Sequence, residues 1–396
     1  MRQAEKHAQK YAILAERVFD GAAVVDNAAV IIEGSRILAV VPRDAVPAKM
    51  PRHALPDGAW LVPGFIDVQV NGGGDVLFNE DPTPDGIRAI AAAHRRYGTT
   101  ALLPTLITDK PETMLSALEA VEALVDKEPS ILGIHLEGPF LSPQRPGVHA
   151  VRHIRTPSNN DLAPLTAPRR SVTVVTLAPE RVPAGFIGAL AGAGVRVCLG
   201  HSMASYADTR AAMAEGLSGF THLFNAMPGL GSRDPGPIAA ALESESAWFG
   251  VIVDGVHVHP ATLRLALRGL ARPMLVTDAM PPVGGRRIGF KLYGEDIMVQ
   301  DGRCTRQDGT LAGSVLDMAS ALRNCVRLLD VRLETALRFV STNPAEFLGL
   351  GHWLGRLAPG CRADLVALDP IGIEVLDTWV AGMRGPNMLG MIAGGP

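Results

Sequence analysis

The chain has 396 residues, of which 47% are hydrophobic and 19% are charged, and its formal net charge is −3. This composition supports a packed globular fold of more than one domain and excludes an intrinsically disordered chain. A slightly acidic chain lacks the basic field that binds a polyanion, so nucleic acid is not expected as a partner. Charged residues interrupt every long apolar segment, so no membrane partner is expected either.

The N-terminal segment MRQAEKHAQKYAILAERV mixes charges of both signs and has no apolar region followed by a small-residue cleavage site. We therefore expect a cytoplasmic protein. The cysteines Cys198, Cys304, Cys325 and Cys361 are widely spaced. Without Cys-x-x-Cys spacing they indicate neither a disulfide framework nor a thiolate zinc site, and we expect buried free thiols.

The two ends of the chain share a β pattern that differs from the middle. Residues 11–62 contain short β segments, such as AVVDNAAVIIEG and SRILAVV, and GRLAPGCRADLVALD and IEVLDTWVAG alternate in the same way near the C-terminus. We expect residues 11–62 and 353–396 to form one small β-sandwich domain, with a barrel and trailing helices over 63–352. The tail after Val380 lacks an alternating strand pattern.

Eight apolar runs in the middle of the chain are candidate barrel strands. They are GFIDVQV, TTALLPT, ILGIHLE, VTVVTLAP, RVCLGH, GFTHLFN, FGVIVD and PMLVTD. Amphipathic helices such as PDGIRAIAAAHRRYG and PETMLSALEAVEALVDKE separate them, and this alternation predicts an α/β fold, a closed (β/α)8 TIM barrel. Two more helices, LDMASALRNCVRLLDV and LETALRFVSTNPAEFLGL, are expected after the barrel.

Polar side chains follow four of the predicted strands, at the edge where such a barrel collects its active site. Glu137 follows ILGIHL, His201 follows VRVCLG, His222 follows SGFT and Asp278 follows PMLVT. A single strand-end histidine is more often structural, but the coincidence of all four groups favours a metal site. Two imidazoles and one carboxylate form the ligand set of many catalytic zinc sites, which leaves Asp278 free to act as a base.

Several motifs closely resemble those of the N-acetylglucosamine-6-phosphate deacetylases of the amidohydrolase superfamily. They are PGFIDVQVNGGGDVLFNE, HLEGPFLSP, LGHSMA, THLFNAMPGLGSRDPG, DGVHV, LVTDAM and TNPAEFLGLG, and the resemblance runs from about Ala12 to Val380. It implies a metal-dependent (β/α)8 barrel with a small β-sandwich made from both chain ends. The implied reaction, in amino-sugar catabolism, removes acetate from the amide of N-acetylglucosamine 6-phosphate.

The resemblance also implies roles for individual residues. Glu137, His201 and His222 would hold one divalent metal ion, zinc ahead of iron or another ion, and Asp278 would be the catalytic acid and base. His257 would lie against the carbonyl oxygen and the substrate. Further substrate contacts would be His149, Asn225, Ala226 and Arg233. The arginine would reach the phosphate of a neighbouring subunit's substrate, which implies a homodimer.

One departure from the wider superfamily concerns the first barrel strand, which usually carries Asp-x-His-x-His. This chain has Asp67, Gln69 and Asn71 at those positions. Because alternate residues share one face of a strand, a second metal would meet two carboxamides, which are poor zinc ligands. No lysine ends a predicted barrel strand to bridge two metals. We expect one metal per subunit and interpret Gln69 and Asn71 as vestigial positions of a second metal site.

Three alternative functions stay open. An N-acetylgalactosamine-6-phosphate deacetylase would act on a substrate that differs in the orientation of one hydroxyl, and the sequence does not separate the two. A cyclic amidohydrolase of the dihydroorotase or hydantoinase kind shares the barrel, but the missing histidine pair and lysine count against it. A non-catalytic scaffold is disfavoured because Glu137, His201, His222 and Asp278 are all present.

Two further groups have a structural interpretation. His135 lies two residues before Glu137 and is a candidate contact beneath the metal, but a hydrogen-bonded barrel histidine is favoured. The run of Gly72, Gly73 and Gly74 lacks the Lys and Ser/Thr of a nucleotide-binding loop, so close backbone packing is favoured there.

Overall fold

The structure is a computed structural model that describes residues 10–158 and 160–385. Within these residues the chain forms two compact units, one of residues 10–66, 95–101 and 318–385 and the other of residues 67–94 and 102–317. The predicted domain boundaries at 62 and 352 remain predictions, and the end of the predicted 353–396 segment lies outside the described residues. Among the residues described, no helix is both long and apolar enough to cross a bilayer.

Eight strands form the barrel sheet in the order β15-β14-β13-β12-β11-β10-β9-β6, and successive strands from β9 to β15 pair in parallel. All eight lie where the sequence predicts a strand: β6 Phe65–Val70, β9 Thr99–Ile107, β10 Gly133–Glu137, β11 Val172–Leu177, β12 Arg196–Leu199, β13 Gly219–Phe220, β14 Trp248–Val251 and β15 Arg272–Leu275. The ring closes because the amide of Asp278 donates to the carbonyl of Gln69 and the amide of Asn71 donates to that of Ala279, at 3.0 and 2.9 Å. The predicted TIM barrel is confirmed.

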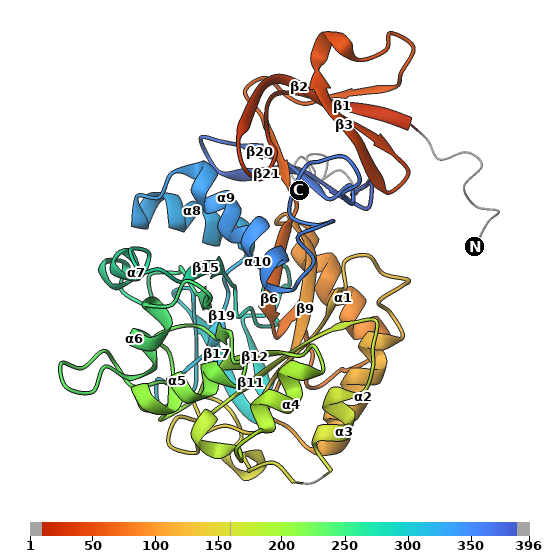
Figure 1. The fold of residues 1–396 in the computed structure, drawn as a ribbon. Helices are drawn as coiled ribbons and strands as arrows, with labels where there is room; N and C mark the ends of the chain where they lie inside the picture. Colours follow the sequence, from red (N-terminus) through yellow and green to blue (C-terminus); the bar gives the residue numbers. More distant parts are fainter. Residues whose placement is uncertain (1–9, 159, 386–396) are drawn as a thin grey trace. The chain divides into compact units, whose positions relative to one another are not determined.

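Seven helices alternate with these strands and lie around the barrel (Figure 1). They are α1 Pro84–Arg95, α2 Pro111–Glu122, α3 Leu162–Thr166, α4 Phe186–Gly192, α5 Tyr206–Ala214, α6 Gly236–Leu242 and α7 Pro260–Ala266. In α1, Ile87, Ile90 and Ala91 are buried at a spacing of three and four residues, which is one face of a helix. Every residue of β6, β9 and β10 is buried, as expected for strands enclosed on both sides.

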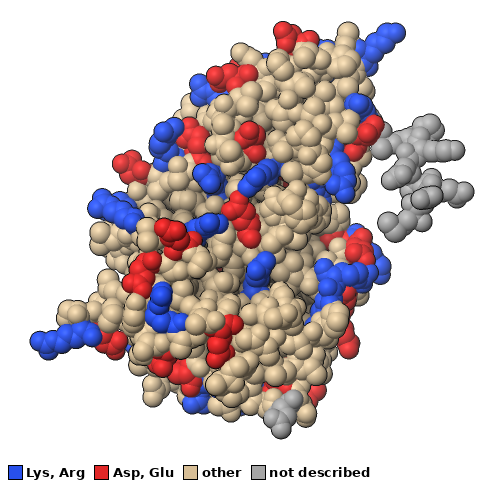
Figure 2. Space-filling model, in the orientation of Figure 1, with Lys and Arg blue, Asp and Glu red and all other residues tan. Residues whose placement is uncertain are grey.

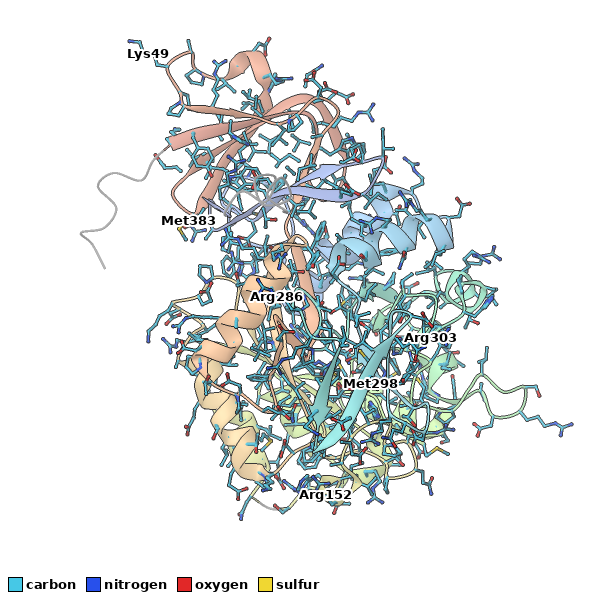
Figure 3. All side chains as sticks on the ribbon, turned by 180° about the vertical axis from the view of Figure 1, so that it is seen from behind. Lys49, Arg152, Arg286, Met298, Arg303 and Met383 are labelled. Atoms are coloured by element: carbon cyan, nitrogen blue, oxygen red, sulfur yellow. The ribbon has the colours of Figure 1, made fainter. Side chains whose placement is uncertain are left out.

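The sequence interpretation did not include a four-stranded antiparallel sheet that follows the barrel strands. It consists of β16 Gly289–Leu292, β17 Glu295–Gln300, β18 Arg303–Thr305 and β19 Leu311–Ser314. Phe290, Ile297 and Cys304 pack on its buried side, whereas Met298 and Arg303, labelled in Figure 3, are exposed. A short hairpin, β7 Gly72–Gly73 and β8 Val76–Leu77, precedes α1, and a Cβ on Gly72 would overlap the carbonyl of Val76. The glycine run therefore serves close backbone packing, as predicted.

Both chain ends join in one eight-stranded sheet, which confirms that they fold together. Its strands are β1 Lys10–Phe19, β2 Val24–Glu33, β3 Arg36–Pro42, β4 Arg52–Ala54, β5 Trp60–Pro63, β20 Leu365–Asp369, β21 Glu374–Val380 and β22 Met383–Arg384. Alternate residues of β1 enter different hydrophobic clusters, with Ile13 and Ala15 in the cluster of Trp379 and Ala12 and Leu14 in another. The short β22 pairs with β21, although the sequence pattern after Val380 indicated no strand.

Three helices precede the C-terminal strands: α8 Met318–Leu329, α9 Leu333–Val340 and α10 Thr342–Phe347. The prediction of one helix over 333–350 was wrong because the chain breaks at Ser341, where φ is −133° and ψ is −72°. Pro344 has no N–H to donate to the carbonyl of Val340, so an unbroken helix would lose that hydrogen bond. The side chain of Ser341 instead donates to the carbonyl of Leu337 at 2.6 Å.

Charged side chains of both signs share the surface of the molecule in Figure 2. On the face drawn in Figure 2, Lys and Arg side chains are interspersed with Asp and Glu. The four cysteines are free and buried, as predicted.

Candidate active site

Glu137, His201 and His222 meet at the carboxyl end of the barrel strands. Glu137 is the last residue of β10, and His201 and His222 follow β12 and β13 by two residues. Oε1 of Glu137 lies 3.0 Å from Nε2 of His201 and 2.9 Å from Nε2 of His222, and the two nitrogens are 3.1 Å apart. All three side chains are buried. The predicted ligands therefore converge on one point.

The donor set fits a divalent cation. Nδ1 of His201 lies 2.8 Å from the carbonyl oxygen of Arg145, and because that oxygen can only accept, Nδ1 carries the proton. Nε2 is then the ring nitrogen left for a ligand, and it lies against Glu137 and His222. An imidazole anchored to a carbonyl in this way is usual for a metal-bound histidine. Three ligand atoms within 4.8 Å of one another match a catalytic site with an open position.

The electrostatics of the cluster suit cation binding. Burial alone would raise the pKa of Glu137, but hydrogen bonds from His201 and His222 outweigh it and hold that pKa well below its usual range. Burial would lower the pKa of His222, but the hydrogen bond to Glu137 outweighs burial and raises it. The carboxylate is therefore ionised at neutral pH, in the form that binds a cation.

Three site residues have a left-handed backbone where the chain leaves a strand. The φ angles of His201, His222 and Asp278 are 48°, 31° and 50°. Such angles are uncommon for residues other than glycine and are retained where the surrounding structure enforces them, often at functional sites.

Asp278 belongs to the same site, and two amides hold its carboxylate. Nε2 of Gln69 and Nδ2 of Asn71 donate to the same oxygen, Oδ1, at 3.2 and 2.6 Å. Burial, reinforced by repulsion from Glu137, raises the pKa of Asp278 to about 6. A carboxyl group with a pKa so close to neutrality is suited to accept a proton and return it.

His257 is held by a residue that the sequence interpretation missed. Nδ1 of His257 donates to Oδ2 of Asp254 at 2.6 Å, and Oδ1 of Asp254 accepts the backbone amides of Val256 and His257 at 2.8 and 2.9 Å. Burial would raise the pKa of Asp254, but the hydrogen bond from His257 outweighs it and lowers that pKa. Because Nδ1 is committed to Asp254, Nε2 is the ring nitrogen left for a ligand.

His149 offers a proton donor to the site. The backbone amide of Thr108 donates to its Nδ1 at 3.3 Å, so Nδ1 is the unprotonated nitrogen. Burial, with repulsion from His201, holds the pKa of His149 well below its usual range, and the ring is therefore neutral at pH 7. Its proton lies on Nε2, which is 3.9 Å from Oε1 of Glu137.

Most of the predicted site residues line one cavity of about 370 Å³. Glu137, His201, His222, Asp278, His257, His149, Asn225, Ala226 and Asn71 line it. Further lining comes from Arg145, before the predicted His149, from Leu311 and Gly313 of β19 in the unpredicted sheet, and from Thr310, which precedes that strand. No sequence pattern pointed to that sheet, whereas the spacing in DGVH could have indicated Asp254, because an Asp often accepts the amides two and three residues ahead.

Arg233 lies apart from the other predicted residues. It is exposed and is not among the residues that line the cavity. The loop before α6 that carries it projects from the barrel (Figure 1). His135 also stays out of the cavity. Its ring is buried between the carbonyl of Val68 and the hydroxyl of Thr176, at 3.1 and 2.7 Å, which agrees with the favoured structural interpretation.

Comparison with known proteins identifies the family. A model of the Amidohydrolase family matches residues 60–395. The chain belongs to the amidohydrolase family. A second family model, described as the NagA composite domain, matches residues 10–61, which form the N-terminal segment of this amidohydrolase.

Relatives of this amidohydrolase agree with the resemblance found in its motifs. An N-acetylgalactosamine-6-phosphate deacetylase of Shewanella is 43% identical over 85% of each chain. An N-acetylglucosamine-6-phosphate deacetylase of Haemophilus influenzae is 32% identical over 94% of this chain and 98% of its own. The crystal structure of the same deacetylase from Pasteurella multocida superposes with a TM-score of 0.92 at 33% identity, over 96% of this chain and all of that one. The predicted family is confirmed, and a candidate site for a metal is present.

Proposed function

We propose that this amidohydrolase hydrolyses the acetamide of N-acetyl-D-glucosamine 6-phosphate to D-glucosamine 6-phosphate and acetate. The observation that carries the proposal is the convergence of Glu137, His201 and His222 with Asp278 in one cavity. Relatives and solved structures of the same length and fold carry the name of this activity. We place the reaction in amino-sugar catabolism and in the cytoplasm, as expected from the sequence.

The metal in this proposal is one divalent ion per subunit, zinc ahead of iron, held by Glu137, His201 and His222. When bound, such an ion lowers the pKa of a water molecule toward about 7 and polarises a carbonyl group. Two imidazoles and a carboxylate suit zinc, although the same set accommodates other divalent ions. Gln69 and Asn71 offer carboxamides where a second metal would need stronger ligands, which supports a single ion.

Asp278 is proposed as general base and then general acid. Its Oδ1 already accepts two amide hydrogen bonds, so Oδ2 is the oxygen available to take the proton of the attacking water. The raised pKa keeps the acquired proton transferable at neutral pH. Asp278 would then return the proton to the sugar nitrogen, which leaves as an amine while acetate forms.

His257 and His149 are proposed to orient the substrate. Nε2 of His257 would lie against the acetyl carbonyl oxygen, where negative charge develops during attack, because Asp254 fixes the other ring nitrogen. Nε2 of His149 would donate its proton to the sugar. These contacts hold the amide in register with Asp278, which is how positioning lowers a barrier.

The phosphate group is proposed to bind at the opposite end of the cavity. Asn225 and Ala226 line the cavity and would contact the substrate near the phosphate. Arg233 is too exposed, on a projecting loop, to serve its own cavity, which supports the interpretation that it reaches the phosphate in a neighbouring subunit. We therefore propose a homodimer in which each chain completes the partner's site.

N-acetyl-D-galactosamine 6-phosphate is a second candidate substrate. The observation that favours it is the relative of that name, which is 43% identical to this chain. The two sugars differ in the orientation of one hydroxyl, and the acetamide and phosphate that the site residues are proposed to contact are the same in both.

Acetate release tests the proposal. The zinc-loaded enzyme should release acetate from N-acetylglucosamine 6-phosphate faster than from the unphosphorylated sugar, with the galactosamine epimer run in parallel. A chelator should abolish turnover, and added Zn²⁺ should restore it. Asp278→Asn is the matched control that keeps the metal ligands and removes the base. Absence of turnover on all three sugars in a folded, metal-loaded sample would refute the proposal.

A further inference from the structure

Gln69 lies on β6 and Asn71 directly follows it, and the NH2 groups of both side chains donate to carboxylates, whereas the buried Oδ1 of Asn71 has no hydrogen-bond partner among the described residues. Nε2 of Gln69 donates to Oε2 of Glu137 at 3.1 Å and to Oδ1 of Asp278 at 3.2 Å. Nδ2 of Asn71 donates to the same oxygen of Asp278 at 2.6 Å. Neither side chain is more than 2% exposed. A pair of merely vestigial residues would not be expected to make three hydrogen bonds to the two acidic groups of the site.

In each carboxylate, the amide donors contact only one of the two oxygens. Glu137 meets both histidines through Oε1 and meets Gln69 through Oε2, so Gln69 holds the oxygen that does not contact the histidines. Both amide donors meet Oδ1 of Asp278, which leaves Oδ2 for the reacting water. An N–H group bonded to an ionised oxygen is among the stronger hydrogen bonds in proteins.

The same hydrogen bonds offset the repulsion between two neighbouring carboxylates. Glu137 and Asp278 are two buried acidic groups, and repulsion from Glu137 contributes to the raised pKa of Asp278. Such repulsion is offset by a cation or by N–H donors placed between the two groups. Here the two N–H bonds of a single amide, that of Gln69, connect them.

We propose that Gln69 and Asn71 are positioning residues that replace the second cation. Asn71 orients the carboxylate of Asp278 for proton transfer, and Gln69 does the same while also fixing Glu137 as a ligand that binds through one oxygen. This inference rests on the proposed function for its effect on turnover. Its effect on metal affinity is independent of the substrate.

The two residues should separate in experiment because only Gln69 contacts a metal ligand. Asn71→Leu removes the donor at similar volume and should lower kcat on the order of 10- to 100-fold, since a hydrogen bond to a charged group is lost. KM should change by less than about threefold, and the chain should still bind one Zn²⁺ with unchanged affinity. Gln69→Met should lower kcat similarly and also weaken Zn²⁺ binding about tenfold or more, as loss of a ligand's hydrogen-bond partner typically does.

A double-mutant cycle tests whether Asn71 acts through Asp278. Once Asp278→Asn has removed the base, Asn71→Leu should lower the residual kcat by less than about twofold. Thr209→Val is the matched control, because it removes a part-buried hydrogen bond at the start of α5, from Oγ1 of a buried threonine to the carbonyl of Ser205, and should leave kcat and metal affinity unchanged. Thermal unfolding and competition with a zinc-binding dye are measured for every variant. Asn71→Ala removes the same donor if the leucine variant does not fold.

Several results would overturn the inference. Asn71→Leu with kcat within twofold of the parent, or with the same loss in the Asp278→Asn background, would show that Asn71 does not act through the base. Gln69→Met with unchanged zinc affinity would refute the proposed hold on Glu137. If the parent enzyme releases no acetate, the proposed function has failed, whereas the zinc-affinity contrast between the two variants still decides whether Gln69 fixes the metal ligand.

Discussion

Asp278→Asn should make the metal-free protein more stable at neutral pH while removing its activity. Burial and repulsion from Glu137 raise the pKa of Asp278 to about 6 from its ordinary value of 3.8. The folded state therefore holds the Asp278 proton more tightly than the unfolded state, and the wild type loses stability as the pH rises between these values. At 1.36 kcal/mol per pH unit, the full loss above pH 6 is about 3 kcal/mol. An asparagine, which does not ionise, avoids this loss and still offers Oδ1 to Gln69 and Asn71.

Urea unfolding of the chelator-treated proteins at pH 4.5 and pH 8 measures the effect. Relative to wild type, the stability of Asp278→Asn should rise by about 2 kcal/mol between the two pH values, since about 1 kcal/mol of the loss has already occurred at pH 4.5. This change with pH does not depend on how well asparagine packs, because packing adds a constant. The slope of the free energy of unfolding against urea concentration should be the same for both proteins.

Asp161→Asn is a control of opposite sign. Burial would raise the pKa of Asp161, but the guanidinium of Arg155 and the hydroxyl of Ser158 outweigh it and lower that pKa to about 2. Because this value lies below both test conditions, the variant should be destabilised by a similar amount at pH 4.5 and pH 8. If the stability difference for Asp278→Asn stays constant or falls as pH rises, the raised pKa of Asp278 and the acid and base role drawn from it are refuted.

Three further predictions concern single positions. A Cβ at position 133 would overlap the backbone of the neighbouring strand β11, so Gly133→Ala should lower the free energy of unfolding by at least about 2 kcal/mol. Gly192 in α4 has open space at the same point, so Gly192→Ala should raise the free energy of unfolding by about 0.5 kcal/mol. Urea titration of the two variants measures both changes. Arg362→Ala leaves the buried carboxylate of Asp364 without its cation, and a loss of about 3–5 kcal/mol is expected by the same titration. Arg233→Ala should raise KM for the phosphorylated sugar at least tenfold and leave the unphosphorylated sugar unchanged in steady-state assays, and equal losses on both would contradict a phosphate contact.

The barrel could be predicted because its signal is local and repeated. Each strand is a short apolar run bounded by polar or glycine-containing loops, and runs such as residues 65–70 and 133–137 are buried throughout. The inserted sheet gave no such signal. In strand β17, with the sequence EDIMVQ, only Ile297 is buried. Exposed residues, some of them charged, interrupt the alternation of apolar and polar residues in this strand. The sheet packs through few side chains of each strand, such as Phe290, Ile297 and Cys304, and this leaves little periodicity to detect.

The candidate site was predictable to the extent that chemistry resides at strand ends. Glu137, His201 and His222 could be chosen from the sequence because barrel topology brings strand ends together whatever their distance along the chain. The positive φ angles of His201 and His222 could not, because only the packed loops enforce them. Asp254 was missed for a related reason. Its carboxylate gains a role only when the turn closes and places Nδ1 of His257 beside it.

Gln69 and Asn71 mark the limit of inference from residue types. Because alternate residues share one face of a strand, the sequence places both carboxamides where a second metal would bind, and carboxamides bind such a metal poorly. What they do instead depends on Glu137, 68 residues from Gln69, and on Asp278, 207 residues from Asn71. Two buried carboxylates in one cavity need positive charge or N–H donors between them, whichever the chain supplies. On a strand with two carboxamides in place of two imidazoles, the N–H donors of the carboxamides therefore take the place of a second cation. Both acidic groups, Glu137 and Asp278, can then be retained in the cavity.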